Sequence, residues 1–217
     1  YPMGRAGLMV AEFRAAGVRD LVLIGSVKRP RLFDMAPDFY TARFFTKLGL
    51  RALGDDGLLK AVRRQLEEEG FILHGFQDFL PQLLMPSGVI GSIMPDERQH
   101  ADIALGIRTA RELGARDEGQ ACVVMNGRVL GVEDAEGTNA LIRRCAGERG
   151  AILVKMCKPQ QDRKLDLPTI GVETVRLCAE LKYAGIVAEA GQSFLIEADA
   201  VRRIADDAGL FVIGVSV

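Results

Sequence analysis

The chain has 217 residues, 48% of them hydrophobic, which is enough for one large globular domain or two small ones with real cores. Its 28 basic and 29 acidic residues nearly cancel, which argues against bulk attraction to nucleic acid and requires any basic site to be local. The four cysteines lack Cys-x-x-Cys spacing, which argues against a zinc site or a disulfide framework and favours reduced cytoplasmic thiols. No apolar run approaches the roughly 20 residues of a membrane span, so we expect a soluble protein that could still touch a membrane surface.

Helical and strand-like patterns alternate in the first third of the chain. We predict helices over 8–16, 42–53 and 57–69, and strands over 20–25 and 70–75. A helix that leads into a short buried strand is typical of an α/β domain, and no strand pattern precedes the first helix. The prediction is a small N-terminal α/β domain, residues 1–78, that lacks its N-terminal strand.

Residues 79–96 are apolar but interrupted by prolines and glycines. A disordered linker would be more polar, so we predict an ordered connector between two domains, whose apolar side chains pack on a domain face. The alternative is that residues 83–94 contact the apolar part of a ligand and line a path for that part.

The remaining residues, 97–217, return to an α/β pattern. We predict helices over 101–113, 137–145, 169–183 and 198–207, and strands over 120–125, 128–133, 151–154, 185–189, 193–197 and 211–215. Asn126-Gly127 between two apolar runs is the strongest short hairpin signal, and a turn at Gly191 joins two further strands. We therefore predict a C-terminal α/β domain with a mixed sheet and at least one antiparallel hairpin, carrying the main catalytic loops.

The segment 155–171 combines cations and carboxylates with two prolines that exclude one continuous helix. Four of its side chains could neutralise a phosphorylated ligand: Lys155, Lys158, Arg163 and Lys164. Asp162 and Asp166 could hold a metal ion or orient water. Pro168 and Thr169 are predicted to form the first turn of a helix, where free backbone N–H groups favour an anion. The alternative is a solvated connector with no ligand.

A second candidate segment, 133–139, follows a predicted strand and opens a predicted helix. The carboxylates of Glu133 and Glu136 would lie beside exposed N–H groups of Gly137 and Thr138, which suits a metal ion and a phosphate together. Simple capping of the helix explains the same residues equally well. Because this loop and the cationic loop both leave strands of one domain, we predict that they face one cleft.

Other polar residues carry weaker signals. Asp55, in an Asp-Asp pair between glycines, resembles a metal- or ribose-binding corner, although the same residues suit any turn between helices. Lys28 follows the first predicted strand, where α/β sheets usually bind ligands, although isolated basic residues are more often surface charges. His74 and His100 share no ligand spacing, so we predict no histidine mechanism. The motifs of P-loop kinases, nicotinamide enzymes and serine hydrolases are absent.

Short motifs along nearly the whole chain resemble one known family. They are Gly54-Asp-Asp-Gly-Leu-Leu59, Gly119-Gln120, Val132-Glu133 with Glu136-Gly-Thr138, Lys155 with Lys158-Pro159, Asp166-Leu-Pro-Thr-Ile-Gly171, Glu189-Ala-Gly191 and Asp207-x-Gly209-Leu-Phe211. Together they resemble the LpxI-type UDP-2,3-diacylglucosamine pyrophosphatases of lipid A biosynthesis. Any one motif is weak, but these stand in the order and spacing of the family. Asn139 departs from the pattern, because the family usually has Asp there.

The resemblance implies a two-domain cytoplasmic hydrolase that cleaves the pyrophosphate of UDP-2,3-diacylglucosamine into lipid X and UMP. It also implies a homodimer, substrate held between the domains, contact with the inner membrane at its periphery, and assistance by Mg²⁺ or another divalent cation. The family's Asp-Leu-Pro-Thr aspartate falls on Asp166, which is therefore the expected catalytic residue. The alternatives are a non-catalytic lipid or nucleotide-sugar binding protein and a structural interaction domain.

Two sets of site residues follow from the motifs and the resemblance. The predicted substrate-binding residues are Lys155, Lys158, Arg163, Thr169, Gly137, Thr138, Asn139, Lys28 and Asp55. The predicted metal ligands are Asp166, Glu133 and Glu136.

Overall fold

The computed structural model describes residues 4–25, 36–48, 55–147 and 149–217, which form two compact units. Unit 1 contains residues 1–79 and the short segment 162–166, and unit 2 contains residues 80–161 and 167–217. The chain therefore passes from one unit to the other at three places. Both units combine helices with strands, so the predicted α/β class is confirmed.

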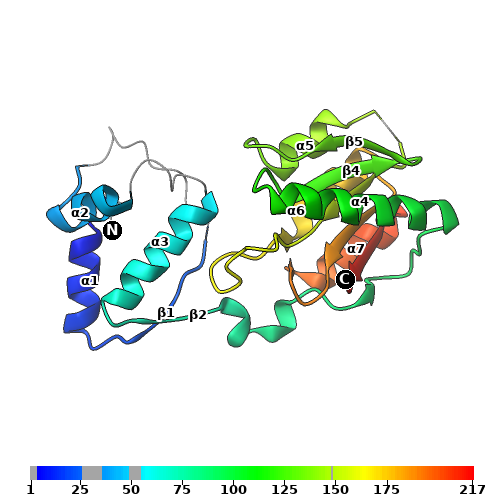
Figure 1. The fold of residues 1–217 in the computed structure, drawn as a ribbon. Helices are drawn as coiled ribbons and strands as arrows, with labels where there is room; N and C mark the ends of the chain where they lie inside the picture. The colour runs from blue at the N-terminus through cyan, green and yellow to red at the C-terminus, as the bar shows by residue number, and fades with distance from the viewer. Residues whose placement is uncertain (1–3, 26–35, 49–54, 148) are drawn as a thin grey trace. The chain divides into compact units, whose positions relative to one another are not determined.

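Unit 1 combines three helices with a two-stranded parallel sheet within its described residues, and α2 packs on α1 (Figure 1). Its elements are α1 (Ala6–Ala15), β1 (Asp20–Val22), α2 (Phe39–Leu48), α3 (Asp55–Glu68), β2 (Ile72–His74) and the 3-10 turn η3 (Phe76–Asp78). The core consists of Val10, Leu66, Phe71 and Leu73, each at most 5% exposed. The predicted helix 42–53 begins earlier, at Phe39, and residues 49–53 of that prediction lie outside the described part of the chain.

Asp38 explains the earlier start of α2. Its carboxylate accepts the Thr41 N–H at 2.7 Å, which caps the helix, and the Gly7 N–H at 2.9 Å, which ties α1 to α2. Desolvation would raise the pKa of Asp38, but the hydrogen bonds from Thr41 and Gly7 outweigh it and lower the pKa. The charged form of Asp38 therefore stabilises the folded unit.

Asp38→Ala is expected to destabilise the protein by about 1 kcal/mol at pH 7, because a helix cap and a link between helices are lost. A lowered folded pKa gives stability that is present above the unfolded pKa of about 3.9 and is lost as the pH falls through the folded value. Urea unfolding should therefore show a difference from the parent at pH 7 that shrinks below about pH 4. Asp38→Asn, which keeps one acceptor oxygen, should fall between the two. Equal urea midpoints for Asp38→Ala and the parent at pH 7 would contradict the assignment.

The main sheet of unit 2 has six strands among the described residues and is mixed. Their order in the sheet is β3 (Gly88–Val89), β10 (Phe211–Val215), β8 (Gly185–Glu189), β6 (Ile152–Lys155), β4 (Ala121–Met125) and β5 (Arg128–Val132). Strands β10, β8 and β6 run parallel, and β4 and β5 form the predicted antiparallel hairpin. Asn126 and Gly127 both have positive φ in the turn, and the buried Asp102 accepts both of their N–H groups.

Helices cover both faces of this sheet, which gives three layers (Figure 1). Helix α4 (Glu97–Ala115) lies on one face, and α5 (Thr138–Arg144), α6 (Val172–Glu180) and α7 (Ala198–Ala208) lie on the other. Alternate residues of the central strands serve the two cores: Val123 and Leu153 face α5 to α7, whereas Val124 and Val154 face α4. None of the described helices has the length and apolar character that crossing a bilayer requires.

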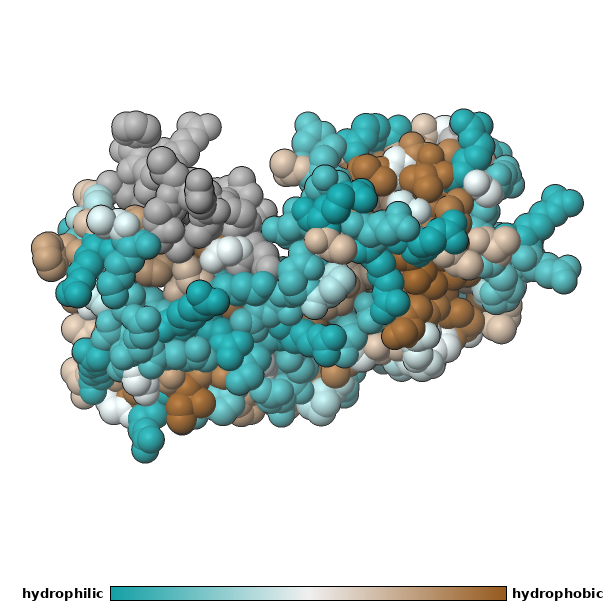
Figure 2. Space-filling model, viewed as in Figure 1, coloured by the Kyte–Doolittle hydropathy of each residue, from teal (hydrophilic) through white to brown (hydrophobic). Residues whose placement is uncertain are grey.

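The apolar segment that precedes α4 packs on unit 2. It contains the 3-10 turn η4 (Pro81–Leu83) and the edge strand β3. Met85 is 1% exposed and belongs to the main core, and Ile90 and Ile93 pack against the two cores of the unit. The predicted packing of this segment is confirmed for these residues, whereas Met94 is 69% exposed. The face seen in Figure 2 is mostly hydrophilic, with apolar side chains gathered mainly over unit 2.

The predicted helix 169–183 is wrong at its start. Thr169–Ile170 is a short strand, β7, which pairs in parallel with β9 (Phe194–Leu195), and α6 begins only after Gly171. Strand β9 is likewise shorter than the predicted strand 193–197, and it pairs with β7 instead of with β8. Hydrogen bonds fix the pairing, from the Phe194 N–H to the Pro168 carbonyl and from the Ile196 N–H to the Ile170 carbonyl. Thr169 is thus not part of a helix N-terminus.

Candidate active site

The sheet of unit 2 brings the loop after β5 and the loop after β6 to the same edge. Both strands are antiparallel to β4, so they run parallel to each other, and the register places Val132 opposite Cys122 and Lys155 opposite Ala121. The carboxyl end of β8 lies at the same edge, because Lys155 also pairs with Ala188. Ligands of α/β sheets bind at this kind of edge, outside the carboxyl ends of parallel strands.

Glu133, the first residue after β5, is 8% exposed and connects β4 to α5. One carboxylate oxygen accepts the Gln120 N–H at 2.9 Å, and the other accepts the Thr138 hydroxyl in a short hydrogen bond. The side-chain oxygen of Gln120 is buried at the same place, without a hydrogen-bond partner among the described residues. Glu133 therefore supports the edge of the sheet, and protein donors engage both of its oxygens.

The exposed residues of this loop form an ion-pair network with Arg144. Asp134 lies 3.0 Å from the Arg144 guanidinium and Glu136 lies 3.5 Å from it, and the Glu136 side chain is 74% exposed. Gly137 turns the chain into α5 with φ 84°, a conformation that glycine adopts without strain. Like-signed carboxylates are thus offset by a cation in this loop, and Glu136 points its charge into solvent.

Asn139 links the first turn of α5 to the first turn of α6. Its side-chain amide donates to the Glu173 carboxylate at 2.8 Å. An aspartate at this position would place two negative charges within hydrogen-bond distance, which is unfavourable. The pair with Glu173 gives a physical reason for the asparagine that the sequence has here.

The loop after β6 is held by contacts within unit 2. Lys158 makes an ion pair with Asp117 at 2.7 Å, and its side chain is only 16% exposed. The Cys157 N–H donates to Glu189, at the end of β8, at 3.2 Å. Glu189 is 9% exposed, and Arg111 from α4 lies 4.0 Å from its other oxygen. Lys155 and Lys158 therefore stand on a braced segment at the edge of the sheet.

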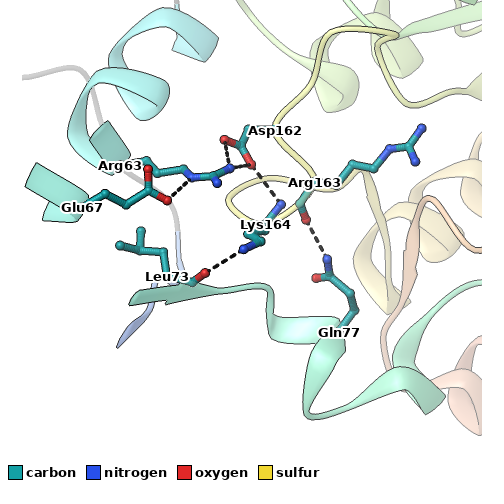
Figure 3. Close-up of polar contacts among 7 residues, drawn as sticks. All are labelled: Arg63, Glu67, Leu73, Gln77, Asp162, Arg163 and Lys164. Atoms are coloured by element: carbon teal, nitrogen blue, oxygen red, sulfur yellow. Dashed lines mark hydrogen bonds and ion pairs between the residues drawn. The ribbon is translucent and has the colours of Figure 1, made fainter. Parts of the chain in front are cut away.

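The next five residues, 162–166, belong to unit 1 and are called the strap below. Figure 3 shows its contacts: Arg63 of α3 donates twice to the Asp162 carboxylate, at 2.9 and 2.7 Å. The Lys164 ammonium donates to the Leu73 carbonyl at 3.0 Å, and the Gln77 amide donates to the Arg163 carbonyl at 2.8 Å. The Arg163 guanidinium extends away from this cluster in Figure 3.

Asp166, the last residue of the strap, is exposed, and its N–H donates to the Asp162 carbonyl at 3.0 Å. Leu165 beside it packs against the core of unit 1. Side-chain packing and backbone hydrogen bonds thus fix the main chain at Asp166, while its carboxylate stands at the surface of the strap.

Family models for two domains match consecutive parts of the chain. Residues 1–83 match the model of the LpxI N-terminal domain, and residues 86–213 match that of the LpxI C-terminal domain. The chain belongs to the LpxI family. It is 38% identical over 224 residues to the UDP-2,3-diacylglucosamine pyrophosphatase LpxI of Caulobacter vibrioides. This match covers 98% of the chain and 80% of the relative. The family resemblance found in the motifs is confirmed.

The predicted site residues of the chain fall into two groups. At the sheet edge and the loops that leave it, unit 2 carries Glu133, Glu136, Gly137, Thr138, Asn139, Lys155 and Lys158, and it carries Thr169 in β7. The strap of unit 1 carries Arg163 and Asp166. Lys28 lies outside the described residues, and so does the side chain of Asp55. The roles of these residues in binding and catalysis stay predictions.

Several polar residues at and near this edge of the sheet were not assigned a role from the sequence. Glu189 is the most informative of them, because a carboxylate that closes a continuous apolar strand is a signal for a strand-end site. Asp117, which pairs with Lys158, and Arg63, which pairs with Asp162, gave no signal in their own segments. Their partners lie 41 and 99 positions away in the sequence.

Proposed function

We propose that this chain hydrolyses the pyrophosphate bond of UDP-2,3-diacylglucosamine to lipid X and UMP, a step of lipid A biosynthesis. The observation that carries the proposal is the 38% identity to an enzyme of that name across 98% of the chain, together with both domain matches. The charges of the described loops support it, because cleavage of a phosphoanhydride needs cations for the diphosphate and a carboxylate for the attacking water.

Lys155 and Lys158 are the residues that we assign to the diphosphate. An ammonium group has three donors, so Lys158 keeps two for phosphate oxygens while it stays paired with Asp117. The braced loop holds both cations before substrate arrives, and charges fixed in advance stabilise the transition state without reorganisation. Arg163, exposed on the strap, remains a predicted substrate-binding residue.

We assign to Asp166 the orientation of the attacking water. In the reaction, the water oxygen forms a bond to one phosphorus and the bridging P–O bond breaks. The bridging oxygen leaves on the other phosphate, and the proton of the water passes to a base or to solvent. A carboxylate can accept hydrogen bonds from such a water and hold it in line with the leaving oxygen.

A divalent cation, Mg²⁺ or another, is part of the proposal. No group of three or more His, Cys, Asp or Glu side chains in the described part of the chain is arranged as a metal cage. Magnesium is usually held by one or two carboxylates and the substrate phosphates, so Asp166 together with the diphosphate fits it. Bound there, the cation would offset phosphate charge as a Lewis acid. Glu136 is exposed enough to contribute, whereas protein donors already engage both oxygens of Glu133.

We extend the proposal to a cytoplasmic homodimer. Because the substrate has two acyl chains, we also propose that the protein meets the inner membrane at its periphery. Exposed apolar side chains in the described residues are consistent with such contact. They include Phe39, Phe79 and Met94, which are 84%, 60% and 69% exposed. Met85, Ile90 and Ile93 pack in the cores of unit 2, so the exposed Met94 is the best candidate of the segment 83–94 for contact with an acyl chain.

The test is release of UMP from UDP-2,3-diacylglucosamine in detergent micelles by the purified chain. We expect release in the presence of Mg²⁺, loss of release with EDTA, and recovery when Mg²⁺ is added in excess. UDP-glucose, which has the same diphosphate but no acyl chains, is the matched control and should remain intact. Binding of the diacylated sugar without cleavage, in either condition, would contradict the proposal and indicate a binding protein.

A further inference from the structure

The strap is attached to unit 1 although both of its ends continue into unit 2. Each of its first four residues has a partner in unit 1: Asp162 with Arg63, Arg163 with Gln77, Lys164 with Leu73, and Leu165 with the core. Asp166 closes the strap. Its main chain is held from both sides, by the contacts of the preceding four residues with unit 1 and by the next residue, Leu167, which is 6% exposed in unit 2.

Arg63 makes the strongest of these contacts. One terminal guanidinium nitrogen, Nη1, donates to both carboxylate oxygens of Asp162, at 2.9 and 2.7 Å. Its Nε atom donates at 2.8 Å to Glu67, one turn further along α3, so the guanidinium is held in place from its own helix. Charge-assisted bonds to a carboxylate are stronger than neutral bonds, such as the one from Gln77 to the Arg163 carbonyl.

Asp162 connects the contact with Arg63 to the end of the strap. Its carboxylate, besides binding Arg63, accepts the Lys164 N–H at 3.1 Å. Its carbonyl accepts the N–H groups of Leu165 and Asp166, at 2.9 and 3.0 Å. Asp162 thus closes a turn that sets the backbone at Asp166, and Arg63 fixes that turn to α3 (Figure 3).

We propose that Arg63 is a positioning residue for Asp166: its contact with Asp162 fixes the strap and thereby the carboxylate that orients the attacking water. The part of the proposal that concerns turnover rests on the proposed function of Asp166. The part that concerns the strap does not. Arg63 touches neither substrate nor reacting atoms in this scheme, and it acts through Asp162.

Hydrogen–deuterium exchange of the full chain tests whether Arg63 fixes the strap. In Arg63→Met we expect faster exchange in peptides that cover residues 162–166, because the Leu165 and Asp166 N–H groups lose a fixed acceptor. Arg64→Met is the matched control, since Arg64 is an exposed neighbour on the same helix, and it should leave the strap unchanged. Arg63→Lys keeps the charge but has one nitrogen where arginine binds Glu67 and Asp162 through two, so it should lie between them. Unchanged exchange in Arg63→Met would overturn the proposal.

Kinetics of UMP release test the link to Asp166. A misplaced catalytic group lowers kcat, so Arg63→Met should reduce kcat about tenfold to a hundredfold with little change in KM. In an Asp166→Ala background the same substitution should have no further effect, because there is no carboxylate left to position. An equal reduction in both backgrounds would overturn the proposal. If Asp166→Ala retains full turnover, the proposed function of Asp166 fails, while the exchange result still decides whether Arg63 holds the strap.

Discussion

Asp166→Ala is expected to lower kcat for UMP release by about a hundredfold to a thousandfold, the loss that follows when one preorganised catalytic group is removed. This corresponds to about 3 to 4 kcal/mol of barrier. The effect should fall on kcat, with KM changed little, because Asp166 is assigned to the water and the cation instead of to ground-state binding of the diacylated sugar. Steady-state kinetics with UDP-2,3-diacylglucosamine and excess Mg²⁺ measure both constants.

The exposed position of Asp166 makes this variant easy to interpret. The side chain stands at the surface of the strap, so its removal creates no cavity, and thermal unfolding of the variant measures any change in stability separately from turnover. Asp199→Ala, which removes a carboxylate that is 88% exposed on α7, is a matched control and should leave turnover unchanged. Full turnover of Asp166→Ala would remove Asp166 from the mechanism.

Gly214→Ala should destabilise unit 2 by about 3 kcal/mol or more. Gly214 lies in β10 opposite Gly88 of the edge strand β3, and a Cβ atom there would meet the Pro86 carbonyl oxygen at 1.9 Å and the Met85 side chain at 2.9 Å. Backbone atoms cannot yield as a flexible side chain does, so the segment around β3 would have to leave its place beside β10. Differential scanning calorimetry should show a melting temperature lower by about 10 °C.

The conformation at Gly171 provides a matched control for that substitution. Gly171 has an extended backbone, φ −141°, and a Cβ atom there would meet only the Ile196 side chain at 3.9 Å, an ordinary contact. Gly171→Ala should therefore change stability by less than about 1 kcal/mol. If Gly214→Ala melted at the same temperature as Gly171→Ala, the close packing of residues 85 and 86 on β10 would be wrong.

Local chemistry made much of the fold predictable from the sequence. The Asn126-Gly127 turn favours positive φ at both positions, and the hairpin formed there as predicted. Strands β8 and β10 are continuous apolar runs bounded by turn residues, and both have the predicted bounds. The start of α6 was not predictable in the same way, because β7 exists only through pairing with β9, about 25 positions further along the chain.

The candidate site was predictable where a motif marks it and hidden where a distant partner decides it. The Asp-Leu-Pro-Thr pattern indicated Asp166, but nothing near Asp162 shows that its carboxylate is bound by a helix 99 positions earlier. The Lys164 ammonium was predicted to face a phosphorylated ligand. It donates instead to the Leu73 carbonyl, a partner 91 positions away that the sequence near Lys164 does not indicate. Asn139 departs from the family's usual aspartate, and only the fold shows that its amide donates to the carboxylate of Glu173, 34 positions away.

The interrupted course of the chain through unit 1 sets the order in which the protein can mature during translation. Helix α3 leaves the ribosome long before its partner segment, since Asp162 is added 99 residues after Arg63. Until then, the guanidinium has no distant carboxylate and the space for Leu165 is unfilled. Unit 1 must therefore wait in an incomplete state while most of the six-stranded sheet is still being made, and non-local closure of this kind is slow.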